Sequence, residues 1–111
     1  MINKGLSIIL VYESIIIEMS TFKMPTLSQF YGILIRMYWK DVGKHKAPHF
    51  HAFYNEYEAI FRLDGDILEG AFPRKQCVLV KAWALLHEED LVKNWSLALN
   101  GEETYKIEPL R

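Results

Sequence analysis

Two histidines spaced two residues apart are the side chains of this sequence best suited to do chemistry. His49 and His51 lie in the tetrapeptide Pro48-His49-Phe50-His51. Successive side chains of a β-strand alternate between its faces, so both imidazoles are expected on the same face. Imidazole titrates near neutral pH, and it can therefore exchange protons with a substrate or ligate a metal ion. The pattern predicts a site on the sheet face that carries this pair.

Binding of a metal ion is one use of such a pair. Some zinc sites take two histidines at this spacing from one strand. A third ligand would have to come from His45, Glu58 or His87. These residues do not form an obvious triad. We therefore expect no resident metal or other cofactor, and we keep a metal-binding module as an alternative.

A second interpretation is metal-independent cleavage of RNA. The imidazoles of His49 and His51 would donate and accept protons during cleavage of a phosphodiester. Neighbouring cations would hold the phosphates. The sequence offers Arg36 as a third catalytic candidate, and as binding candidates it offers Arg62, Lys44 and Lys46.

The third interpretation is a binding surface without catalysis. A cationic, aromatic face can recognise a protein or the backbone of RNA. Taken singly, each residue also has a structural explanation. A strand histidine often hydrogen-bonds a neighbouring carboxylate, here the binding candidate Glu58, and Arg36 and Arg62 can form cross-strand ion pairs with it. The clustering of two histidines in one tetrapeptide is what sets this face apart.

Period-two alternation of apolar residues predicts a small antiparallel sheet around the histidines. The predicted strands are Phe30–Trp39, His49–Tyr54, Tyr57–Leu63 and Asp66–Glu69. Asn55-Glu56 and Asp64-Gly65 are typical of tight turns between neighbouring strands. Apolar side chains point to one face, and alternation gathers polar ones on the other, namely Arg36, His49, His51, Glu58 and Arg62.

After the last predicted strand the apolar spacing changes to that of a helix. Pro73 suits a first helical turn, and the pattern predicts a helix over Arg74–Leu86 that continues through His87–Leu99. Asn100-Gly101 is a typical helix end. Strands followed by helix predict an α+β domain, a small antiparallel sheet of about four strands with helix packed on one face.

Length and composition fit one globular domain in a reducing compartment. The chain has 111 residues, of which 50% are hydrophobic and 24% are charged. This composition excludes wholesale disorder. The net charge of −1 gives no overall attraction to nucleic acid or to an anionic membrane. Cys77 is the single cysteine, which excludes an internal disulfide and predicts a cytoplasmic protein.

Residues 1–23 differ in pattern from the rest of the chain. Their apolar run is too short to span a membrane and contains Glu13. No small-residue cleavage site of a signal peptide follows it. We expect residues 1–23 to be an N-terminal extension, either translated upstream sequence or one extra packed element, and residues 24–111 to be the single α+β domain.

An ordered set of short motifs in residues 24–111 resembles a known family. The motifs are Met24-Pro25-Thr26, Phe30-Tyr31-Gly32-Ile33, Ile35-Arg36-Met37-Tyr38, Pro48-His49-Phe50-His51, Glu69-Gly70, Pro73-Arg74, Asn94-Trp95 and Ile107-Glu108-Pro109-Leu110. On these motifs the chain is similar to the small bacterial family catalogued as domain of unknown function 4160. The resemblance implies no established activity. It implies a gene that often lies beside that of a second small protein, as in toxin–antitoxin or related two-gene modules.

The resemblance also bears on the site. Arg36, His49 and His51 lie in the family's hallmark segments, so the resemblance implies that these three residues carry the function. The chain departs from the commoner form in Lys44-His45-Lys46-Ala47, where many relatives have Asn or Pro before Pro48. That departure from the family's commoner sequence argues against a functional role for His45.

We therefore expect a component of a toxin–antitoxin-like two-gene module that acts by binding a small protein partner encoded nearby. The first alternative is a metal-independent ribonuclease-type toxin that uses the face of His49 and His51. The second is a metal-binding module. RNA is an alternative partner, self-association into a homo-oligomer is left open, and we expect no membrane partner.

Overall fold

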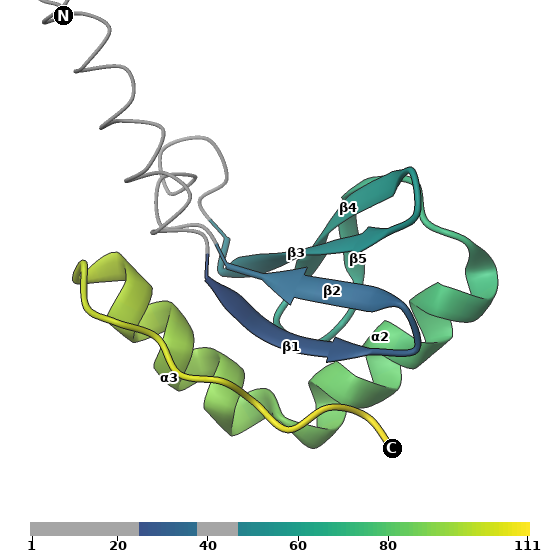
Figure 1. Cartoon of the computed structure of the whole chain (residues 1–111). Coiled ribbons are helices and arrows are strands. Elements are labelled where there is room, and N and C mark those ends of the chain that lie inside the picture. Colours follow the sequence, from purple (N-terminus) through teal and green to yellow (C-terminus); the bar gives the residue numbers. More distant parts are fainter. Residues whose placement is uncertain (1–24, 38–46) are drawn as a thin grey trace, which may run out of the picture.

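The computed structural model describes residues 25–37 and 47–111. Within these residues the chain forms five strands and two helices. In chain order they are β1 (Thr26–Phe30), β2 (Ile33–Arg36), β3 (His49–Tyr54), β4 (Tyr57–Arg62), β5 (Ile67–Gly70), α2 (Arg74–Leu86) and α3 (Glu88–Leu99). Figure 1 shows both helices along one face of the sheet. The predicted N-terminal extension, residues 1–23, lies outside the described residues.

The strands form an antiparallel meander in which each strand pairs with the next one along the chain. This arrangement confirms the predicted α+β class. Among the residues that the structure describes, no helix has the length and apolar character needed to cross a membrane.

The sheet has five strands, whereas about four were predicted. The strand that the alternation pattern missed is β1. A register shift between Thr26 and Ser28 interrupts the pairing of β1 with β2. Such a bulge breaks the period of two on which strand prediction depends. Tyr31 and Gly32 then form a tight turn with φ values of 49° and 79°. The predicted strand Phe30–Trp39 therefore begins on β1, crosses this turn and continues into β2.

The central strands follow the prediction closely. β3 has the predicted bounds, and β4 ends one residue earlier than expected. Asn55 occupies the turn between them with φ 53°, a conformation that asparagine tolerates better than most residues. Alternation sends Phe50 and Phe61 inward, where their rings stack with centroids 5.6 Å apart.

The helix layer is divided at His87, whereas a continuous helix was predicted. The His87 N–H is shared between the carbonyls of Trp83 at 3.1 Å and Ala84 at 3.2 Å. Its φ of −122° lies outside the helical range, and α3 begins at the next residue. Figure 1 shows α2 and α3 diverging from this junction.

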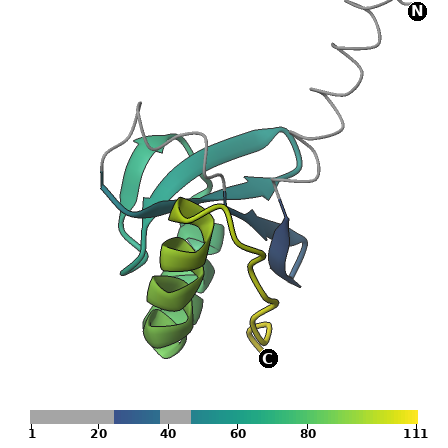
Figure 2. The same ribbon diagram turned by 90° about the vertical axis from the view of Figure 1, so that its left-hand side faces the viewer.

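The tail after α3 runs back along the helix layer and reaches the edge of the sheet at β1 (Figure 2). The side chain of Asn94, which is fully buried in α3, forms two hydrogen bonds with the backbone of the tail. The Asn94 Nδ2 donates to the Tyr105 carbonyl at 3.0 Å, and the Tyr105 N–H donates to Asn94 Oδ1 at 2.8 Å. The Ile107 N–H then donates to the Leu27 carbonyl at 2.7 Å. The tail is thus part of the fold.

We predict that Asn94→Ala lowers the free energy of unfolding by about 2 kcal/mol or more, because it leaves a backbone donor and an acceptor of the tail without partners. Urea unfolding of the full chain measures this change. Asn100→Ala is the matched control, since Asn100 is exposed at the end of α3, and we expect it to cost under about 0.5 kcal/mol. Equal effects of the two substitutions would contradict the role given to Asn94.

Candidate functional site

The predicted site lies on the face of the sheet that points away from the helices. Side chains on this face alternate with the buried Phe50, Ala52, Ala59 and Phe61. We call it the outer sheet face, and it includes Leu34, Arg36, His49, His51, Phe53, Glu58, Ile60, Arg62 and Glu69.

Strand register places an arginine on each side of the histidine pair. Arg36 of β2 lies directly opposite His51 of β3. Arg62 of β4 lies directly opposite His49 on the other side of β3. The two histidines of the middle strand are therefore flanked by one arginine from each neighbouring strand, which brings the three catalytic candidates and Arg62 together.

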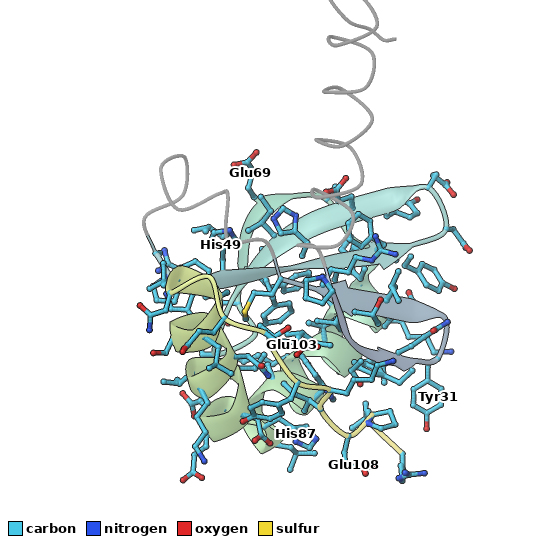
Figure 3. All side chains as sticks on the ribbon, turned by 60° about the vertical axis from the view of Figure 1, so that its left-hand side comes forward. Tyr31, His49, Glu69, His87, Glu103 and Glu108 are labelled. Atoms are coloured by element: carbon cyan, nitrogen blue, oxygen red, sulfur yellow. The ribbon has the colours of Figure 1, made fainter. Side chains whose placement is uncertain are left out.

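Both imidazoles are buried, although alternation predicted them on an open face. His49 is fully buried and His51 is 4% exposed. Their ring centroids are 5.6 Å apart. His49 also lies 5.1 Å from the ring of Trp95 in α3, so it packs against the helix layer at the start of its strand. Figure 3 shows His49 close to that helix.

Each ring has a defined partner at Nδ1. His49 Nδ1 is 2.8 Å from the Ala47 carbonyl, and because a carbonyl only accepts, this nitrogen carries the proton. His51 Nδ1 is 3.4 Å from Glu58 Oε2. The carboxylate orients the ring as in an acid–base pair. The structure thus brings the binding candidate Glu58 to His51.

The arginines have no carboxylate partner among residues 25–37 and 47–111. The expected ion pairs of Arg36 and Arg62 with Glu58 do not form there, because Glu58 turns to His51. The guanidinium carbon of Arg36 lies 6.0 Å from the centroid of the Phe53 ring. Its Nε is buried, and no described residue accepts a hydrogen bond from it.

Other candidates do not join this group. Lys44, Lys46 and His45 lie outside the described residues. His87 sits at the junction of α2 and α3, 5.7 Å from the Trp83 ring, and Figure 3 shows it at the far end of the molecule from His49. In the part of the chain that the structure describes, no three metal-ligating side chains of His, Cys, Asp or Glu are grouped closely enough to hold a metal ion.

The structure also reveals a surface that sequence reasoning missed. Five large apolar side chains project from the helices away from the sheet, with exposed fractions between 46% and 70%. We call them the outer helix face, and they are Val78, Leu85, Leu86, Val92 and Leu99. Val78 and Leu85 lie seven residues apart in α2, and Val92 and Leu99 lie seven apart in α3. This spacing places each pair on one side of its own helix. This spacing is the sequence signal from which the outer helix face could have been predicted.

We predict that His49→Ala lowers the free energy of unfolding by about 2–3 kcal/mol, because the change opens a cavity beside Trp95 and removes the hydrogen bond to Ala47. His87→Ala is the comparison, since its side chain is 20% exposed whereas His49 is fully buried, and we expect it to cost less, about 1 kcal/mol. Urea unfolding compares the two variants. An unchanged midpoint for His49→Ala would contradict the packing role.

Comparison with known proteins places this architecture in a family. Residues 32–96 match the family model described as domain of unknown function (DUF4160). The matched region runs from the turn before β2 through most of α3 and includes Arg36 and both histidines. Neither the comparison with curated proteins nor that with solved structures gives a match. The match covers more than half of the chain, and the protein therefore belongs to the family of domain of unknown function DUF4160.

Proposed function

We propose that the protein is an interaction module that binds a second protein through the outer helix face. The observation that carries this proposal is the exposure of five large apolar side chains on helices whose opposite sides already pack against the sheet. Large apolar side chains gathered on the exposed side of a helix are a feature of sites that bind other proteins. Their burial against a partner would contribute about 25 cal/mol for each Å² removed from water.

Charge beside the outer helix face indicates the chemistry of the partner. α2 carries Arg74, Lys75 and Lys81 and has no acidic residue. Lys81 Nζ donates to Asp66 Oδ1 at 2.6 Å, and this hydrogen bond raises the pKa of the Lys81 ammonium. Arg74 and Lys75 remain as exposed cations. The first turn of α3 carries the opposite charge, with Glu88, Glu89 and Asp90. An amphipathic helix with acidic residues beside its apolar side would complement the α2 part of this surface.

A small protein encoded nearby would fit this role. The family resemblance supports a two-gene module of the toxin–antitoxin kind, in which one small protein binds the other. The lone Cys77 supports a cytoplasmic setting. Within such a module this chain acts by binding.

The alternative uses of the histidine pair have less support. Acid–base cleavage of RNA needs imidazoles that reach the substrate, whereas His49 is fully buried and packs on Trp95. A metal-binding module would need a third ligand, and Glu58, one of its candidates, is engaged by His51.

We predict that Leu85→Glu weakens binding of the co-expressed neighbouring protein by roughly tenfold or more, because it places a charge in an apolar interface. Titration calorimetry of the purified chains measures the affinity. Ser96→Glu is the matched control, since it adds the same charge at an exposed polar position of α3, and we expect a change below about twofold.

His51→Ala separates this proposal from the catalytic alternative. Its side chain lies on the outer sheet face, so we expect the affinity for the partner to stay within about threefold of the unsubstituted chain. Tight binding by Leu85→Glu together with loss of binding by His51→Ala would contradict the proposal.

A further inference from the structure

Arg36 is a permanently charged side chain on the outer sheet face, at the end of β2. Its guanidinium cannot lose its proton at any ordinary pH. The ring of Phe53 lies beside this group, and no described residue forms an ion pair or a hydrogen bond with it. A partly buried cation without an acceptor is costly. The cost would be offset by an anion that binds at this position.

Arg62 supplies a second cation on the other side of β3. It is exposed and forms no ion pair within residues 25–37 and 47–111. Strands two apart in a sheet lie roughly 10 Å from each other, a separation that two extended arginine side chains can bridge. Arg36 and Arg62 can therefore converge on one group that lies over β3 beside His51.

The carboxylates of this face do not neutralise the two arginines. Glu58 contacts His51 rather than either arginine. Glu69 belongs to β5, where it lies opposite Ile60 at the edge of the sheet, and Figure 3 shows its carboxylate projecting away from the sheet. The part of the face nearest the histidines thus keeps a positive charge.

We infer that the outer sheet face binds a phosphate group, held by Arg36 and Arg62 with His51 beside them. Guanidinium groups match the oxygens of phosphate with two parallel hydrogen bonds each. A tetrahedral group with several oxygens can accept from both arginines at once, whereas a planar carboxylate has only two oxygens to share. This site is separate from the outer helix face, so phosphate binding and partner binding can be tested independently of each other.

The phosphate can come from a free ion, from a nucleotide or from the backbone of RNA. We would titrate the full chain with inorganic phosphate, with uridine 5′-monophosphate and with a short oligouridylate, and would measure binding by calorimetry. Equal affinity for all three probes assigns an isolated phosphate group as the ligand. Stronger binding of the oligouridylate assigns the RNA backbone.

Substitutions locate the site. We expect Arg36→Gln and Arg62→Gln each to weaken binding of the best probe by about tenfold or more, as expected for the loss of a charge-assisted hydrogen bond. Arg74→Gln removes the same charge from α2, on the other layer of the domain, and we expect a change below about twofold. If Arg36→Gln fails to fold, the exposed Arg62 still provides the test, with circular dichroism to confirm its fold.

Two results would overturn the inference. The first is that none of the three probes binds the unsubstituted chain. The second is that Arg74→Gln weakens binding as much as Arg36→Gln and Arg62→Gln do, which would show a diffuse attraction to the net positive charge of the surface. As a second readout, the ring resonances of His51 should shift when phosphate is added to the unsubstituted chain and should not shift in Arg36→Gln.

Discussion

The indole of Trp83 holds three parts of this molecule together. It is fully buried in α2, with ring centroids 5.3 Å from Phe30 and 5.7 Å from Phe50 of the sheet. Its Nε1 donates to the Glu108 carbonyl of the tail at 2.8 Å. These contacts bury one side of the sheet and one side of the helix layer. The opposite side of each layer stays available to bind other molecules. The outer sheet face and the outer helix face are the two sides that remain.

The fold was predictable wherever its local pattern is regular. β3 has its predicted bounds because His49–Ala52 alternates polar with apolar residues and the turn at Asn55 follows Tyr54. α2 has its predicted bounds because Pro73 precedes a continuous apolar spacing. β1 was not predictable by alternation, since its bulge after Thr26 shifts the period. The division at His87 depends on a hydrogen bond shared between two carbonyls, which no spacing of residue types encodes.

The sequence predicts which residues share the face of the site. It does not predict how deeply they are buried or which residues they contact. Alternation alone brings Arg36, His51 and Arg62 to the same side of the sheet. The burial of His49 depends on Trp95, which is distant in sequence and reaches it only when α3 packs beside β3. The outer helix face was readable as a seven-residue spacing, but an apolar stripe does not itself show which side of a helix meets the sheet.

We propose a distinct role for each outer side of this two-layer protein. The direct test is hydroxyl-radical footprinting, which reports the exposure of single side chains. It would be run on the chain alone and on its complex with the neighbouring protein proposed as its partner. Leu85 and Leu86 should be oxidised severalfold less in the complex. Tyr31 in the turn between β1 and β2 and Ile67 of β5, both exposed, should react as before. Unchanged oxidation of Leu85 and Leu86 in a stable complex would contradict the assignment of the outer helix face as the partner-binding surface.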